Sequence, residues 1–272
     1  MSDIVLSAGV RSNLLNLQQT SNLITQTQTR LATGKKVNSA LDNANAFFTA
    51  QGLDNRASDL SNLLDNMSTA INTINAANNG ITSITKLVQS AQSLVSQAQQ
   101  TTDTTTRASL SSQFDQLLTQ IGQLAGDSGF NGINLLGGNT LTVTLDETNN
   151  ASVSVTGVDY TNAATGLSIA NAVNNWSGSA DITAASTDLT AALTSLRSES
   201  QTLSSSLSTV QIRQDFTNAT INTLQTGSAD LTLADSNQEG ANLLALQTRQ
   251  QLSTTALSLA AQSDQNVLKL FQ

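Results

Sequence analysis

The stretch that decides the fold is residues 53–98, LDNRASDLSNLLDNMSTAINTINAANNGITSITKLVQSAQSLVSQA. Its apolar side chains recur at steps of four and three residues, and only two of the fourteen seam positions are polar. The seam consists of Leu53, Ala57, Leu60, Leu64, Met67, Ile71, Ile74, Asn78, Ile81, Thr85, Val88, Ala91, Val95 and Ala98. Such a repeat puts one narrow apolar stripe along a helix that needs a partner helix. A helix over residues 45–100 would be roughly 80 Å long, so the stretch predicts an elongated helical protein.

The composition fits helices that pack through thin seams. Only 11% of the 272 residues are charged, 3% are aromatic, and proline and cysteine are absent. The absence of proline permits long uninterrupted helices, and the absence of cysteine excludes disulfides and thiolate metal sites. The net charge is −8, with no basic stripe of the kind that nucleic acid binding requires.

The N-terminal part predicts a helix over residues 6–32. Its seam is formed by Val10, Leu14, Leu17, Ser21, Ile24, Gln28 and Leu31. Gly34 follows as a left-handed residue that ends the helix. Ser39 and Asp42 resemble a capping box for the start of the long helix. Gly80 weakens that helix by about 1 kcal/mol relative to Ala, which favours a bend over a break.

The middle of the chain changes character. Residues 101–106 predict an interruption, and the apolar positions of residues 110–124 predict a helix antiparallel to the long one. From Gly126 on, glycines and Asn131-Gly132 predict turns. Residues 141–145 and 153–155 alternate as strands of a hairpin. Residues 157–180 are ambiguous, with a short helix over 167–172 as one prediction and Trp176 as a local packing anchor.

Helical periodicity returns at residues 189–224, the expected partner of the opening seam. Gly227-Ser228 predicts an interruption, Asp235 and Ser236 offer N-cap chemistry, and a last helix is predicted from about Asn237 to Leu270. The fold class is therefore mainly α: an elongated antiparallel bundle or coiled coil of long helices. Its terminal helices pair with each other, and a small β-hairpin region lies at the distal middle.

The residues argue against an enzyme. Without histidine and cysteine, the commonest general base, the Ser-His pair and the usual transition-metal ligands are missing. Asp54, Asp59 and Asp65 do not stack on one helix face, so a solvated or ion-pairing role is expected for them. We predict no catalytic residues, no metal site and no cofactor.

The N-terminal sequence and the hydropathy of the chain bear on whether the protein carries a signal peptide or binds a membrane. Residues 1–13 lack the basic segment and apolar run of a Sec signal peptide. There is no run of about 18 apolar residues, and the polar helix faces are poor in Lys and Arg. We therefore expect no membrane partner and, if the protein is exported, another export route.

Three motifs give the chain a family resemblance. Residues 30–42, RLATGKKVNSALD, are similar to the L-S-S/T-G-x-x-I/V-N-S-A-x-D signature of bacterial flagellins. Residues 129–132, GFNG, match the family's F-N-G turn, and residues 265–271, QNVLKLF, resemble its terminal Q-x-V-L-x-L-L motif. Residues 45–50, NAFFTA, are most similar to the alphaproteobacterial branch. The resemblance covers nearly the whole chain.

The resemblance implies a structural subunit that polymerises into the flagellar filament for motility, secreted through the flagellar type III apparatus. It implies inner-core, channel-lining coiled-coil helices in residues 1–44 and 228–272. Residues 45–135 and 181–227 would form the long-helix domain, and residues 136–180 a short outward-facing variable segment. The terminal packing residues would be Leu14, Leu17, Ile24, Leu31, Leu252, Leu257, Val267, Leu268 and Leu270. Partners would be other copies of the chain or other flagellins, with an export chaperone, cap and junction proteins.

Three alternatives remain at this point. A hook–filament junction protein shares the terminal ground plan of a flagellin. A secreted helical adhesin or binding module would use residues 140–180. The apolar stripes would also suit an intramolecular bundle in a monomer. One departure from the family is the uncharged stretch 87–102, where related chains carry Arg and Glu in the region that the innate flagellin receptor recognises. We therefore predict weak receptor activation.

Overall fold

The computed structural model describes residues 8–270, apart from the side chains of residue 264 and residues 267–270. The described residues divide into two compact units. The terminal unit contains residues up to 55 and from 223 on, and the central unit contains residues 56–222. Most described residues are helical and one two-stranded sheet is present among them, as the mainly α fold class predicts.

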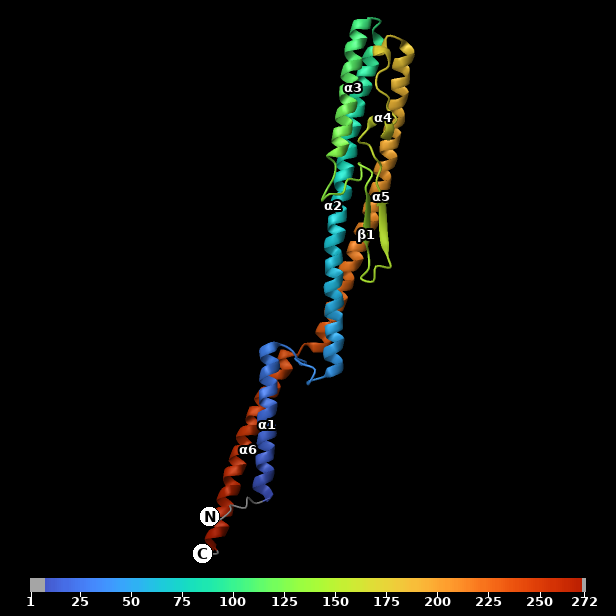
Figure 1. Ribbon diagram of the computed structural model, residues 1–272. Coiled ribbons are helices and arrows are strands. Elements are labelled where there is room, and N and C mark those ends of the chain that lie inside the picture. Colours follow the sequence, from blue (N-terminus) through green and yellow to red (C-terminus); the bar gives the residue numbers. More distant parts are fainter. Residues whose placement is uncertain (1–7, 271–272) are drawn as a thin grey trace. The chain divides into compact units, whose positions relative to one another are not determined.

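The elements follow the predicted order (Figure 1). They are α1 (Ala8–Thr33), α2 (Ala44–Gln100), α3 (Thr104–Gly126), β1 (Thr140–Thr144), β2 (Ser152–Thr156), α4 (Ala163–Gly166), the 3-10 helix η1 (Asn174–Trp176), α5 (Ser179–Thr232) and α6 (Ser236–Leu270). Gly34 has a φ of 68° and ends α1 as predicted. Asn131, with a φ of 49°, and Gly132, with a φ of 80°, form the predicted turn.

Helices α2 and α5 run antiparallel in the central unit. Gln214 Nε2 donates to Ser68 Oγ at 2.9 Å, and Ser200 Oγ donates to Asn78 Oδ1 at 3.5 Å. Residue numbers rise along α2 from Ser68 to Asn78 while their partners on α5 fall from Gln214 to Ser200, so the two helices are antiparallel. The buried face of α2 is wider than the predicted seam, because Leu63, Ala70, Ala77 and Ile84 are also buried. A second element therefore covers the flank of this helix.

That second element is the segment that follows α3. Gly80 has no room for a Cβ, which would collide with Ser128 Oγ and lie 2.7 Å from Leu136 Cδ1. No bend is needed to explain this glycine, since it permits the close approach of the loop. On the hairpin, Leu141 and Val143 are buried.

The hairpin is confirmed with an antiparallel register. Leu141 pairs with Val155 and Val143 with Val153. Its turn is closed by Asp146, whose Oδ1 accepts from Ala151 N at 2.9 Å. Arg56 Nε on α2 donates to Glu147 Oε1 at 2.6 Å, which ties the turn to the helix.

Trp176 is the packing anchor that the sequence predicts. It is fully buried against Phe114 of α3, with ring centroids 5.0 Å apart. Apolar burial in the central unit is extensive. The largest fully buried side chains are Trp176, Phe114, Met67, Ile74, Ile84, Ile121, Leu135, Leu136, Ile169, Ile182, Leu189 and Leu196.

Two sequence predictions about helix limits in the later chain are wrong. The short helix predicted over residues 167–172 is absent, because Asn162 caps the one-turn helix α4 earlier and Ser168 has a φ of 56°. Gly227-Ser228 does not interrupt α5, which continues to Thr232. Gly227 is instead packed near Leu53, and one glycine weakens a helix without ending it.

Two helices, α2 and α3, begin at residues slightly different from those that the sequence predicts. The Ser39–Asp42 hydrogen bonds form, but they close a turn before α2, and Asn43 caps the helix by accepting from Ala46 N at 3.0 Å. The interruption after α2 covers only residues 101–103, because Asp103 accepts from Thr106 N at 2.8 Å and starts α3 there.

Candidate functional site

Helices α1 and α6 pack side by side and make up most of the terminal unit (Figure 1). The face of α1 toward α6 carries Val10, Thr20 and Thr27, all buried, and the half-buried Leu17, Ile24 and Leu31. The less exposed positions of α6 are Glu239, Leu243, Leu246, Gln250, Ser253, Leu257 and Ala260, again at steps of four and three. The pair is thus a short coiled coil with a partly polar seam.

One ion pair crosses this seam. Arg30 Nη1 donates to Glu239 Oε1 at 3.1 Å, and both residues are largely withdrawn from solvent. Arg30 Nε and Glu239 Oε2 are buried without a hydrogen-bond partner. The pair therefore uses half of the fork-to-fork geometry that an arginine and a carboxylate can form.

The connectors α1–α2 and α5–α6 are hydrogen-bonded to each other. Lys36 N donates to Thr232 O at 2.7 Å, and Ala234 N donates to Gly34 O at 2.9 Å. Lys36 Nζ also donates to Asp230 O at 2.8 Å. We call residues 34–37 and 232–234 the connector clasp. It fixes where both terminal helices begin or end.

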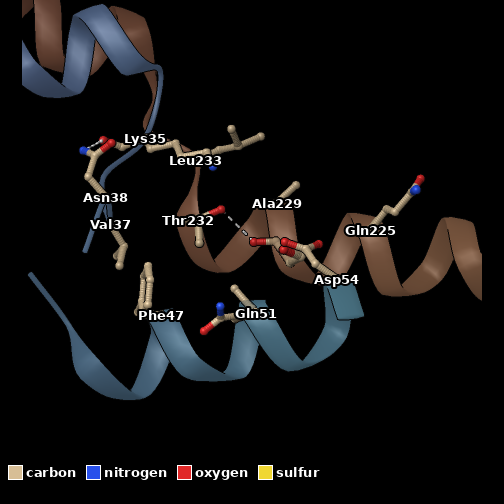
Figure 2. A pocket seen from close by; sticks show the side chains of 12 residues that line it. Lys35, Val37, Asn38, Phe47, Gln51, Asp54, Gln225, Ala229, Thr232 and Leu233 are labelled. Carbon is tan, nitrogen blue, oxygen red and sulfur yellow. Dashed lines mark hydrogen bonds between the residues drawn. The ribbon is translucent and has the colours of Figure 1, made fainter. Parts of the chain in front are cut away.

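A cavity of about 370 Å³ lies beside the connector clasp (Figure 2). Val37 and Phe47 supply its apolar wall, and Lys35, Asp54 and Gln225 supply separate polar groups around it. Inside the wall, Thr232 Oγ1 donates to Ser228 O at 2.9 Å, and Asn38 Nδ2 donates to Lys35 O at 3.0 Å. The hydroxyl group of Thr232 and the amide group of Asn38 therefore satisfy local backbone carbonyl groups.

The turn before α2 exposes the side chain of Leu41 to solvent. Asp42 Oδ2 accepts from Asn38 N and Ser39 N, both at 3.0 Å, and these bonds hold the pKa of Asp42 below its usual value. Leu41 on this turn is 98% exposed. The hydrogen bonds of this turn therefore hold a leucine side chain in an exposed position.

The packing residues that the sequence predicts differ in how exposed their side chains are. Leu17, Ile24, Leu31 and Leu257 lie half-buried. Leu14, at 39% exposed, and Leu252, at 67%, lie outside the seam. The side chains of Val267, Leu268 and Leu270 lie outside the described part of the chain.

Sequence reasoning missed the threonines of α1. It placed the second seam position at 14, 21 and 28, whereas the structure uses 13, 20 and 27. Thr20 is buried because its Oγ1 donates to Asn16 O at 2.8 Å, which satisfies its hydroxyl group and leaves a methyl group toward the seam. The predicted seam already contained the polar Ser21 and Gln28, so the error is a shift of one residue at every second seam position.

The terminal unit exposes much of its apolar surface. The buried apolar residues in the described part of this unit are Val10, Val37 and Ala50. Its large exposed apolar residues are Leu14, Leu15, Leu23, Leu41, Phe48, Leu233, Leu244, Leu252 and Leu259. Leu244, Leu252 and Leu259 lie on the side of α6 that faces away from α1, by helical periodicity. The terminal unit of the single chain therefore leaves many large apolar side chains exposed.

Residues 8–270 contain neither an acidic cluster suited to a metal ion nor a helix able to span a membrane. The acidic side chains described there form no group of three that could hold a metal ion. Over the same residues, none of the helices has the length and hydropathy needed to cross a bilayer.

The comparisons with known proteins agree in one assignment. Residues 9–141 match the bacterial flagellin N-terminal helical region, and residues 186–271 match the C-terminal helical region. The flagellin FljK of Caulobacter vibrioides is 32% identical over 281 residues, covering all of this chain and 99% of the relative. The flagellin of Brucella melitensis is 27% identical, with both chains fully covered.

Among solved structures, the crystal structure of Bacillus cereus flagellin is 20% identical with a TM-score of 0.46, over 57% of this chain and 88% of the other. The family models and the full-length Caulobacter relatives confirm the predicted resemblance, including its alphaproteobacterial character. The chain belongs to the bacterial flagellin family, and it is a structural subunit of the flagellar filament.

Proposed function

We propose that this flagellin polymerises by burying the exposed apolar surface of its terminal unit against other copies. The observation that supports this is the imbalance in that unit, where few apolar side chains are buried and many leucines are bare. Fully burying a leucine is worth about 1.5–3 kcal/mol. A surface that is costly in the monomer thus becomes the driving force of assembly.

The same proposal covers the three-part division of the chain. Residues 1–44 and 228–272 form the inner core, residues 45–135 and 181–227 the long-helix domain, and residues 136–180 the outward segment. The packing residues are Leu14, Leu17, Ile24, Leu31, Leu252, Leu257, Val267, Leu268 and Leu270. The exposure of Leu14 and Leu252 in the monomer supports a role for these two between copies.

Export and partners belong to the proposal as well. The chain leaves the cell unfolded through the flagellar type III apparatus, assisted by an export chaperone, and joins a filament bounded by cap and junction proteins. The lack of cysteine supports passage between redox compartments without mispairing. We expect no catalytic role, because the chain lacks histidine and cysteine.

The first test is limited proteolysis of the full chain as dilute monomer and as filament. A two-helix pair with a partly polar seam is only marginally stable by itself, so we expect both ends to be trimmed in the monomer. The central unit should survive, and filaments should protect both ends. Ends that resist protease in dilute monomer would contradict the mechanism.

The second test replaces one bare leucine. Leu252→Ser should raise the critical concentration for polymerisation at least about tenfold, since most of that side chain awaits burial. Gln247→Ser, an exposed polar position on the same helix, serves as the matched control and should have little effect. Equal critical concentrations for the two variants would argue against burial of Leu252.

A further inference from the structure

The chain contains two asparagine–glycine pairs, Asn79-Gly80 and Asn131-Gly132. An asparagine before glycine is chemically labile, because the glycine carries no side chain to shield its backbone nitrogen from the amide carbon of the asparagine. Both asparagine side chains are exposed. The backbone around each pair therefore decides whether the glycine nitrogen can reach that carbon.

The first pair lies inside a helix. Gly80 is buried in the middle of α2, so its backbone nitrogen belongs to the hydrogen-bond ladder of that helix. Ser128 and Leu136 pack against this glycine, and Ser83 Oγ donates to Asn79 O at 3.0 Å. Ring closure at Asn79 thus requires that α2 unwind and that the covering loop move away, which is an opening of the core.

The second pair forms a two-residue turn. Phe130 N donates to Ile133 O at 2.9 Å and Ile133 N donates to Phe130 O at 3.0 Å, so the hydrogen bonds of the turn join the residues on either side of the pair. The φ values are 49° at Asn131 and 80° at Gly132, as in a type I′ turn. Gly132 is exposed, and its nitrogen donates neither of the two bonds. Breaking these two hydrogen bonds therefore frees the backbone of the pair.

We propose that Asn131 is a site of spontaneous deamidation in the folded protein, whereas the helix protects Asn79. The backbone nitrogen of Gly132 loses its proton and attacks the side-chain carbonyl carbon of Asn131. The bond from that carbon to the amide nitrogen breaks, and ammonia leaves with the proton. Water opens the remaining succinimide at either carbonyl carbon, which leaves aspartate or isoaspartate at position 131.

The surroundings of Asn131 show what the reaction would change. Asn131 lines a cavity of about 210 Å³ together with residues of α2 and β1, among them Asn66, Thr73 and Thr142. The lining consists of amide, hydroxyl and apolar side chains, so a new carboxylate is not compensated by a cation of the lining. Isoaspartate also adds a methylene group to the backbone of a turn with a fixed two-residue geometry. Deamidation therefore weakens this turn and makes the protein more acidic.

The test follows both pairs in the same molecule. The full-length monomer is incubated in mildly alkaline buffer, once folded and once in urea, and peptide mapping by mass spectrometry measures aspartate and isoaspartate at positions 79 and 131. In the folded protein we expect deamidation at 131 to be at least about tenfold faster than at 79, which requires a difference of only about 1.4 kcal/mol in the free energy of opening. In urea the two rates should become similar. Equal rates in the folded protein, or a position 131 that stays intact when folded but deamidates in urea, would overturn the proposal.

Two variants assign the acidic form of the protein to one residue. Isoelectric focusing of the incubated, folded chain should show an acidic form that grows with time. Asn131→Gln should remove most of it, because glutamine must close a larger ring and reacts far more slowly. Asn79→Gln, the matched control in α2, should leave it unchanged. An acidic form that persists in Asn131→Gln would place the reaction at another residue and contradict the assignment.

Discussion

The guanidinium group of Arg107 on α3 donates from Nε to the carbonyl oxygen of Ala98, 3.2 Å away in the last turn of α2. The same Nε donates to Thr101 O at 2.8 Å, and Nη1 donates to Ser177 O at 3.2 Å, just before α5. Arg107 is buried. One side chain thus joins the end of α2, its loop and the segment leading into α5, and its charge complements the negative end of α2.

Replacing Arg107 should destabilise the central unit. Arg107→Ala leaves three carbonyl groups without this donor, and we expect a loss of about 2–4 kcal/mol in the free energy of unfolding. Urea denaturation followed by circular dichroism measures it. Arg197→Ala, on an exposed face of α5, should change stability by less than about 0.5 kcal/mol. Similar losses in both variants would mean that the three hydrogen bonds add nothing.

Two glycines of α2 should respond in opposite directions to alanine. Gly80→Ala places a methyl group against Ser128 and Leu136, and we expect a loss of about 1–3 kcal/mol despite the better helix propensity. Gly52→Ala meets nothing within 4 Å and should gain up to about 1 kcal/mol. Thermal unfolding of both variants checks this, and a stabilising Gly80→Ala would show that the loop is not packed as described.

Glu199 should make the central unit less stable as the pH rises. Burial raises the pKa of Glu199, and burial together with the charge of Glu199 raises the pKa of Tyr160 to about 12. A raised carboxyl pKa means that the folded state holds the proton more tightly, so stability falls as the pH increases from about 4.5 through the folded-state pKa.

Glu199→Gln should therefore raise the melting temperature at pH 7 and flatten its decline above pH 4.5. Asp103 acts in the opposite direction, because its hydrogen bonds with Thr106 lower its pKa and its contribution is lost at acid pH. Asp215→Asn, on the same helix as Glu199 but exposed, is the control. Melting temperatures measured between pH 4.5 and 8 test this prediction. If the melting temperatures of wild type and Glu199→Gln change with pH in parallel, Glu199 does not cause the loss of stability.

A more apolar seam should tighten the terminal pair. Thr20→Val keeps the shape of a buried side chain and replaces its hydroxyl group with a methyl group. We expect slower proteolysis of the monomer's ends and a lower critical concentration. Thr25→Val, at an exposed position of α1 whose hydroxyl also bonds the preceding turn, controls for helix propensity. Equal cleavage rates for the two variants would show that position 20 does not limit pairing.

The sequence carries most of the helical ground plan, because periodicity survives in long helices. The seam of α2, the turn at Asn131-Gly132 and the β-hairpin all follow from local patterns. Packing between distant residues does not. Nothing near Gly80 in the chain reveals that Ser128 lies against it. Gly227 predicts a helix break from the sequence alone, but in the structure it packs near Leu53 and the helix continues.

The sequence predicts that the terminal helices pair, but it predicts less well which of their residues face the seam. Heptad spacing located α1 and α6, but it could not choose between positions 14 and 13 because both flank Leu17 at helical spacing. In α5, the periodicity of residues 189–224 places Val210 and Thr217 on the seam, and both are buried in the structure.

The connector clasp also determines when the terminal unit can fold relative to the rest of the chain. The contacts of the clasp and of the α1–α6 pair join residues far apart in the sequence: Lys36 and Asp230 are 194 positions apart, and Arg30 and Glu239 are 209 apart. Contacts between such distant residues cannot form until both have arrived. A chain that emerges gradually from one end must hold its first segment unpaired until nearly the last residue appears. In the proposed export of the chain, the terminal unit therefore completes last.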